Sequence, residues 1–408
     1  AALLACWLRA AAGRGRSRAA AGVCLDAKAP PIGGGASVPS VSAMLAEEGT
    51  HTFDASFKGT HKDLPWENMT WNDYLGAGSF GKVFNVSFGQ AQEHCPSGAP
   101  WALKVSKPGD PESTESSEDS EKAACLGHAL AATVGGEAPP FLGATDVRIY
   151  EGREYTLMPQ ASTDLGAWLS SESHKTDIKL FFHVFHQLLS AIVQMHEAGA
   201  VHCDMKPENV MLSWTPEGVP PRVYLIDFDT ARPVHNKKRY LTGTGGYRSP
   251  DYFRSRVCGP DTDLWAAGVI LHELVFGAGA DPYEWQNEAE EAKNAIEFRE
   301  DLKAMGKSRV AKKISHNVPK GAQQTLFKLF LALFAKPTGR KALDYAKRLV
   351  EWSYPKAPLP AAGARGGTWQ CAKDVQGAEG AAKSHRAIFR GKVAECFRLP
   401  RPQRALQA

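Results

Sequence analysis

The spacing of apolar positions predicts strands in the first third of the chain and helices after it. Residues 74–88 ("YLGAGSFGKVFNVSF") hold two strand-like segments around a glycine-rich stretch, and residues 99–106 ("APWALKVS") read as a further strand. Residues 147–158 ("VRIYEGREYTLM") predict a hairpin that turns at Glu151 and Gly152. In residues 180–195, apolar side chains recur every three or four positions, at Leu180, Phe181, Val184, Phe185, Leu188 and Ile192. This spacing predicts a buried amphipathic helix and not a membrane span.

Composition changes this picture mainly at the two ends. The chain of 408 residues has 43% hydrophobic and 23% charged residues, which is typical of a globular protein. Residues 1–65 begin with an Ala- and Arg-rich stretch, which favours either a disordered basic tail or a presequence that targets an organelle. Residues 355–408 are rich in Pro, Ala, Gly and basic residues, so we expect a mostly disordered basic tail.

Charge and cysteine usage limit the classes of partner. A net charge of +4 does not indicate nucleic-acid binding. The eight cysteines are scattered without a CxxC pair or metal-ligand spacing, so reduced thiols in an intracellular, cytoplasmic protein are the simplest expectation. Targeting to an organelle stays open, and the oligomeric state cannot be read from the sequence.

The glycine-rich stretch is the first candidate phosphate site. Gly76, Gly78 and Gly81 have no Cβ atoms, so the backbone there could close over a phosphate chain. The stretch also fits GxxxxGK, the start of a P-loop, but Val83 follows Lys82 where a P-loop requires Ser or Thr for magnesium. This argues against a P-loop NTPase, and an ordinary glycine-rich hairpin remains the alternative for this motif alone.

Lys104 is the candidate cation for those phosphates. It lies in the apolar strand "WALK", downstream of the glycine-rich hairpin. An ammonium held there needs an acidic partner, and the helix-like end of residues 112–130 offers Glu118 and Glu121. Glu121 is preferred because it lies within the helix, whereas Glu118 is close to its first turn, where an acid complements the helix dipole.

The stretch "VHCDMKPENVML" (residues 201–212) carries the candidate chemistry. Asp204 could accept or orient a hydroxyl proton, Lys206 could neutralise a transferring phosphoryl group, and Asn209 could bind a metal through its amide oxygen. A second stretch, "VYLIDFDTARP" (223–233), is a strand that ends at Asp227, a natural magnesium ligand beside a phosphate site. Taken singly, each of these is better interpreted as an ordinary polar turn residue.

In order, these motifs closely resemble those of the eukaryotic protein kinase family, serine/threonine branch. The matching elements are GAGSFG, "WALK", HCDMKPEN, DFD, "GTGGYRSPD" (243–251) and "DLWAAGVILHELVFG" (263–277). The resemblance implies an α+β, bilobal fold over residues 71–354. A small β-rich lobe with one helix would span residues 71–158, and a mainly helical lobe residues 159–352.

The resemblance also implies a residue-by-residue assignment. Asp204 is the catalytic base, Lys206 contacts the γ-phosphate, and Asn209 and Asp227 hold Mg²⁺. Lys104 binds the α- and β-phosphates and pairs with Glu121, while Thr244 bridges Asp204 and Lys206. The remaining ATP-binding positions are Gly76, Gly78, Ser79, Phe80, Gly81, Val83, Ala102 and the hinge residues Leu157 and Met158. The expected activity is Mg-dependent transfer from ATP to serine and threonine hydroxyls of a protein substrate.

Three departures from the family pattern qualify this expectation. Cys203 stands where an arginine usually reads a phosphorylated activation loop, so the enzyme is not expected to be switched that way. We expect this thiol to be an inert, small apolar residue, and oxidation of the thiol is the alternative. Asp229 stands where the family prefers glycine. Asp251 replaces the family's glutamate, and we expect it still to pair with Arg340, as that glutamate does with its arginine. A pseudokinase that binds ATP as a scaffold is the main alternative, and a small-molecule kinase is a second.

Overall fold

The computed structural model describes residues 59–60, 69–78, 81–88, 100–106, 122–123, 125–127, 129–130, 140–144, 146–150, 153–171, 177–214, 220–239, 243–304 and 307–353. These residues form two compact units. The first contains the described residues up to Ser106 together with residues 148–160, and the second contains the rest. Ser79, Phe80, Glu121, the turn at 151–152, residues 1–58 and residues 355–408 lie outside the described residues. Residues 59–60, which the sequence analysis placed in the N-terminal tail, form a short strand instead.

A six-stranded sheet forms the first unit. Its strand order is β1 (Gly59–Thr60), β2 (Met69–Gly78), β3 (Gly81–Phe88), β4 (Trp101–Ser106), β6 (Arg153–Pro159) and β5 (Asp146–Tyr150). The strands expected in residues 74–88 and 99–106, and on both sides of the 151–152 turn, are therefore confirmed. Phe84, Val86, Trp101 and Leu103 share one buried face of β3 and β4, as the period of two requires, and Ala102 on the other face of β4 is buried as well.

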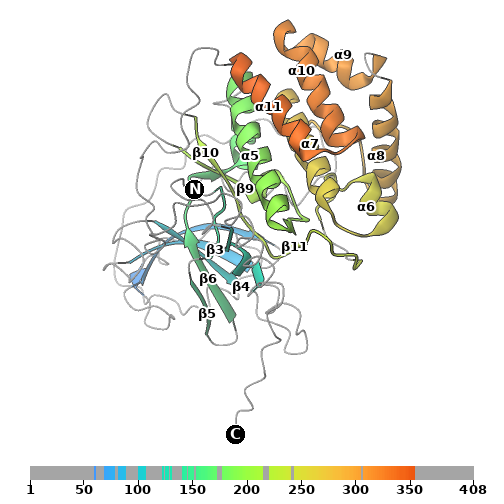
Figure 1. The fold of residues 1–408 in the computed structure, drawn as a ribbon. Coiled ribbons are helices and arrows are strands. Elements are labelled where there is room, and N and C mark those ends of the chain that lie inside the picture. Colours follow the sequence, from blue (N-terminus) through green and yellow to red (C-terminus); the bar gives the residue numbers. More distant parts are fainter. Residues whose placement is uncertain are drawn as a thin grey trace, which may run out of the picture. The chain divides into compact units, whose positions relative to one another are not determined.

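The second unit is mainly helical (Figure 1). Its helices are α4 (Leu165–Ser170), α5 (Ile178–Ala198), α6 (Pro250–Ser255), α7 (Pro260–Phe276), α8 (Glu288–Lys303), α9 (Arg309–Asn317), α10 (Lys320–Phe330) and α11 (Gly339–Ser353). A π-helical turn, η5 (Leu331–Ala335), continues α10. Its short strands are β7 (Thr163–Asp164), β8 (Ala200–Val201), β9 (Val210–Ser213), β10 (Arg222–Leu225) and β11 (Arg232–Pro233).

Helix α5 is the central helix predicted from the apolar spacing. The Asp177 side chain caps its first turn, and Gly199 ends it at φ 100°, a conformation that glycine adopts without strain. Its buried face packs against α7, α11 and β10. By length and apolar composition, α5 is the one described helix that could also cross a membrane. A core helix passes the same test, and the buried face matches the amphipathic helix expected from the sequence.

Short strands fix the loop that carries the candidate catalytic residues. The loop leaves β8 and returns as β9 through a 3₁₀ turn, η3 (Pro207–Asn209). Strand β9 pairs with β10, and β8 pairs with β11, all antiparallel. Because β10 and β11 flank Asp227, these two ladders hold the loop and the segment around Asp227 beside each other.

Candidate active site

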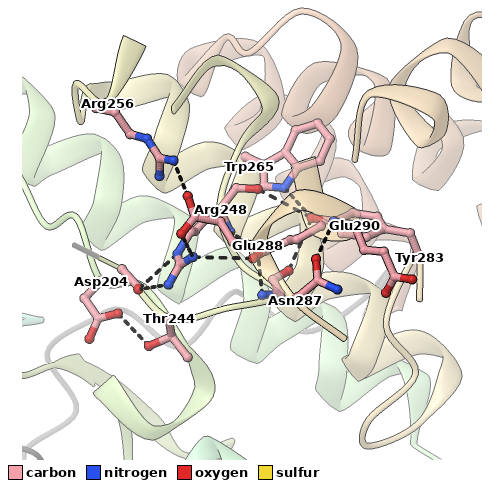
Figure 2. Close-up of polar contacts among 12 residues, drawn as sticks. Asp204, Thr244, Arg248, Arg256, Trp265, Tyr283, Asn287, Glu288 and Glu290 are labelled. Carbon is pink, nitrogen blue, oxygen red and sulfur yellow. Dashed lines mark hydrogen bonds and ion pairs between the residues drawn. The ribbon is translucent and has the colours of Figure 1, made fainter. Parts of the chain in front are cut away.

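Three predicted residues form one hydrogen-bonded group on the loop between β8 and β9 and the segment before α6. The Thr244 hydroxyl donates to Asp204 Oδ1 at 2.7 Å, and Lys206 Nζ donates to Asp204 Oδ2 at 2.9 Å. Lys206 Nζ also donates to Thr244 Oγ1 at 3.1 Å. Figure 2 shows Asp204 and Thr244 pointing toward each other. The structure thus makes the Thr244 bridge that the family resemblance implied.

Asn209 and Asp227, the two predicted metal ligands, are brought together by the backbone. The Asn209 carbonyl accepts a hydrogen bond from Ile226 N at 3.1 Å, next to Asp227 in the chain. The Asn209 amide nitrogen donates to the Asp204 carbonyl at 2.8 Å, so its amide oxygen is the atom that could ligate a metal. An amide oxygen and a carboxylate are hard oxygen ligands and fit Mg²⁺.

Asp227 itself has an unusual backbone. Its φ of 63° lies in the left-handed region, which side chains with a Cβ seldom adopt. The His202 ring, whose Nε2 lies 2.9 Å from the Ile226 carbonyl, and the Thr230 hydroxyl, which donates to the His202 carbonyl at 2.8 Å, bracket this position. Such strain, held by surrounding contacts, is frequent at functional sites.

Within the first unit, strand register groups the predicted nucleotide-binding residues. Val83 lies opposite Lys104, and Ala102 lies opposite Met158, so these four side chains share one face of the sheet. Leu157 pairs with Leu103 and is buried on the other face. Gly76 pairs with Val83, and a Cβ added there would meet no atom within 4 Å. Packing therefore does not require glycine at this position, which leaves room for a ligand against the backbone.

Residues of α8 and the loop before it hold the segment that carries Thr244. Glu291 Oε1 accepts hydrogen bonds from Gly246 N at 2.6 Å and Arg248 N at 3.3 Å. The Arg248 guanidinium donates to the Gly243 carbonyl at 3.1 Å and lies 3.6 Å from Glu291 Oε2. Burial raises the pKa of the Glu291 carboxyl, against the opposing effect of Arg248 and the two backbone donors.

Trp285 fixes the same segment from another side. A Cβ on Gly245 would lie 2.8 Å from the indole ring, and one on Gly246 2.9 Å from its Nε1. Gly246 also has φ +88°. The two consecutive glycines after Thr244 are therefore required by the close approach of Trp285, and at Gly246 also by the backbone conformation.

Asp263, in the first turn of α7, is a residue of the site that the sequence analysis did not single out. Its carboxylate accepts hydrogen bonds from His202 N at 2.8 Å and Cys203 N at 2.9 Å, and His196 Nε2 lies 2.8 Å from it. Burial would raise the pKa of Asp263, but these contacts outweigh it and lower that pKa below its ordinary value. An acid within the apolar run "DLWAAGVIL" was the available sequence signal.

Cys203 is not a free thiol in the structure. It forms a disulfide with Cys258, which lies between α6 and α7, and the two Cα atoms are 5.8 Å apart. This corrects both the expectation of reduced thiols and that of an inert thiol at Cys203. The pair is separated by 55 residues, so spacing gave no hint of it. The packing of α7 beneath the loop between β8 and β9 brings the two cysteines together.

The two other departures also look different in the structure. Asp229 is not among the described residues with positive φ, so this conformation does not need the freedom of a glycine there. Asp251 pairs with Arg299 at 2.7 Å and with Arg254, not with Arg340 as expected. Arg340 instead lies 2.7 Å from Glu197. The expected pair was wrong because α8 supplies an arginine to Asp251.

Comparison with protein families gives one assignment. The family model described as "Protein kinase domain" matches residues 70–340, which is about two thirds of the chain. The match spans the glycine-rich strands, the loop between β8 and β9, and the helices from α5 to α10.

Curated proteins are similar over shorter stretches. An Aurora kinase of Eremothecium gossypii is 34% identical over 131 residues, which are 31% of this chain and 34% of that protein. Serine/threonine-protein kinase PKH2 of Candida albicans is 34% identical over 118 residues, 26% of this chain and 12% of that protein. The alpha chain of calcium/calmodulin-dependent protein kinase type II of Drosophila melanogaster is 35% identical over 137 residues, which are 28% of this chain and 26% of that protein. The chain thus spans about a third or less of these relatives.

Proposed function

The chain belongs to the protein kinase family, and we propose that it transfers the γ-phosphate of ATP to serine and threonine hydroxyls of protein substrates. The observation that carries this proposal is the group formed by Thr244, Asp204 and Lys206. It combines a carboxylate that can receive a hydroxyl proton with an ammonium that can face a phosphoryl group. A relative named as a serine/threonine-protein kinase supports the same substrate class.

The roles of the residues follow from this geometry. The acceptor hydroxyl would sit at Asp204, which orients it and takes its proton as the new P–O bond forms. Lys206, held by Asp204 and Thr244, offsets the charge that develops on the transferred group. When bound, Mg²⁺ neutralises the phosphate oxygens of ATP, and Asn209 and Asp227 are the residues that would hold it. Lys104, which lies on β4, would bind the α- and β-phosphates of ATP.

We also propose that activity does not depend on phosphorylation of the segment after Asp227. Cys203 occupies the position of the family's phosphate-reading arginine and is bonded to Cys258 instead. The described part of that segment is held by the β8–β11 ladder and by Val234 N, which donates to the Gly199 carbonyl at 2.8 Å. Tyr240 and Thr242, two hydroxyl-bearing residues of this segment that could be phosphorylated, lie outside the described residues.

The proposed transfer is tested with purified full-length chain, Mg·ATP and a generic protein substrate. We expect Asp204→Asn and Lys104→Met each to lower kcat by at least about a hundredfold while the far-UV circular dichroism stays unchanged. Phosphoamino-acid analysis of the product should give phosphoserine and phosphothreonine.

Two controls separate this proposal from its alternatives. Lys238, an exposed cation outside the proposed site, serves as the matched surface position, and Lys238→Met should keep wild-type turnover. ATP binding by the wild-type chain without any turnover would contradict the proposal and identify a pseudokinase. Phosphorylation of a small metabolite in place of protein would identify the other alternative.

A further inference from the structure

We propose that the Cys203–Cys258 disulfide positions the catalytic Asp204, so that phosphoryl transfer reaches its full rate only when this bond is formed. The inference rests on the proposed kinase activity. Cys203 precedes Asp204 directly, and Cys258 lies two residues before α7. Both sulfur-bearing side chains are buried, at 3% and 4% exposure.

The bond acts together with Asp263 to fix the catalytic loop to the start of α7. The Asp263 carboxylate accepts hydrogen bonds from the backbone of His202 and Cys203, and the disulfide adds a covalent tie from Cys203 to the residues just before the same helix. The hydrogen bonds fix the peptide groups, whereas the disulfide fixes the side-chain end of Cys203. Together they restrict both the translation and the rotation of the residue next to Asp204.

The backbone of Cys203 needs such restraint. Its φ of 71° lies in the left-handed region, which is unfavourable for a residue with a Cβ. Without sufficient restraint, rotation toward negative φ would relieve this strain. Because Asp204 follows in the chain, that rotation would move its carboxylate away from Thr244 and Lys206. The structure with the closed disulfide has all three residues assembled, so the oxidised form is the competent one.

The disulfide also contacts the segment that follows Asp227. Val201, Cys203 and Cys258 form a small buried cluster, and Val234 packs against it. Arg232 and Pro233, which precede Val234, form β11 and pair with β8. A covalent bond therefore lies where the resembling kinases place an arginine that reads a phosphate. The bond joins the loop to the residues before α7, and the segment after Asp227 packs on the same cluster through Val234 without any phosphate group.

The chemical step is a thiol–disulfide exchange. The two thiols of Cys203 and Cys258 lose two protons and two electrons as the S–S bond forms, and a small-molecule disulfide takes up both and becomes two thiols. A dithiol reverses the step. Because both sulfurs are buried, exchange in the folded protein needs local opening, so the bond is expected to persist through catalysis once formed.

The test compares wild type and Cys258→Ala, both as full-length chains, before and after treatment with a dithiol. Peptide mapping first verifies the bond, and incubation continues until the wild type shows both thiols. We expect reduction and the substitution each to lower kcat about tenfold or more, since a displacement of about 1 Å can cost that much, with the KM for ATP unchanged within about twofold. Oxidised glutathione should restore the reduced wild type.

Three comparisons separate positioning from other effects. Cys125 is also disulfide-bonded, so the dithiol must lower the activity of wild type but leave Cys258→Ala unchanged. Cys258→Val keeps the apolar volume without the bond and should stay as slow as Cys258→Ala. Cys203→Ala combined with Cys258→Ala should be no slower than either alone, because each removes the same bond. Assays run well below the lowest Tm, so that lost stability alone leaves kcat unchanged.

Hydrogen exchange gives a readout that does not need activity. Amides of residues 202–206 should exchange faster in Cys258→Ala than in oxidised wild type, while those of α10 stay unchanged. Wild-type kcat in Cys258→Ala, or equal exchange at residues 202–206 in the two proteins, would overturn the inference. A wild type without turnover but with the expected difference in exchange would instead refute the proposed kinase activity and leave the positioning of the loop supported.

Discussion

Replacing Asp263 by asparagine should destabilise the fold because it leaves one buried backbone donor, the N–H of Cys203, without an acceptor. In the wild type, Asp263 Oδ2 lies 2.8 Å from both His202 N and His196 Nε2, and Oδ1 accepts from Cys203 N at 2.9 Å. An asparagine amide has only one oxygen. It is best placed at the position of Asp263 Oδ2, where both His202 N and His196 Nε2 lie within hydrogen-bond distance. Its NH₂ group then faces the N–H of Cys203, and two donors oppose each other in a buried site.

The expected magnitude follows from these contacts. The substitution removes one hydrogen bond to a charged acceptor, worth about 1.5–3 kcal/mol, and leaves a buried donor unsatisfied at a cost of about 1–3 kcal/mol. The two figures overlap in part, so we expect the free energy of unfolding to fall by about 3 kcal/mol. The loss should be present at neutral pH, since the lowered pKa of Asp263 keeps the wild-type carboxyl ionised until the solution is strongly acidic.

Urea unfolding followed by far-UV circular dichroism measures this change. Asp261→Asn is the matched control because Asp261 lies in the same first turn of α7, and burial raises the pKa of its carboxyl. Since a raised pKa means that burial disfavours the charged carboxylate, Asp261→Asn, which introduces a neutral amide, should change the free energy of unfolding by less than about 1 kcal/mol. The reasoning is refuted if Asp263→Asn also stays within about 1 kcal/mol of wild type, or if both substitutions cost the same.

Four further predictions test other parts of the structure. Asp227→Asn should lower kcat with Mg²⁺ by at least about a hundredfold, and unchanged turnover would reject the metal assignment. Asp229→Gly should raise kcat because it removes a carboxylate near the metal ligands, and a lower kcat would mean that Asp229 takes part in the site. Gly246→Ala should cost about 1–3 kcal/mol of stability from its positive φ and its contact with Trp285, and Trp285→Ala should recover only the part due to contact. Burial lowers the pKa of His272 from 6.5 to about 4. The neutral ring therefore contributes about 3 kcal/mol to the free energy of unfolding above pH 6.5, and this contribution is lost as the pH falls toward 4. His272→Gln should make the free energy of unfolding in urea fall less steeply between pH 6.5 and pH 4.

The local elements and the candidate chemistry could be predicted from the sequence because each depends on near neighbours in the chain. The apolar spacing of residues 180–195 predicted α5, and the glycine-rich stretch predicted the strands that became β2 and β3. Asp204, Lys206 and Asn209 lie within six residues, so a loop of that length must hold them close together. The ordered motifs likewise predicted the α+β protein kinase fold, which the family match confirms.

Pairings between distant residues depended on the tertiary structure. The sequence contains Cys203, Cys258 and Asp263, but only the packing of α7 beneath the loop between β8 and β9 brings them together, in a disulfide and two hydrogen bonds from backbone N–H groups to Asp263. The partner of Asp251 was likewise chosen by the approach of α8, which brings Arg299 closer than the expected Arg340. Periodicity and motif spacing report which face of an element is buried, not which element covers it. Only the packed helices determine which side chains meet.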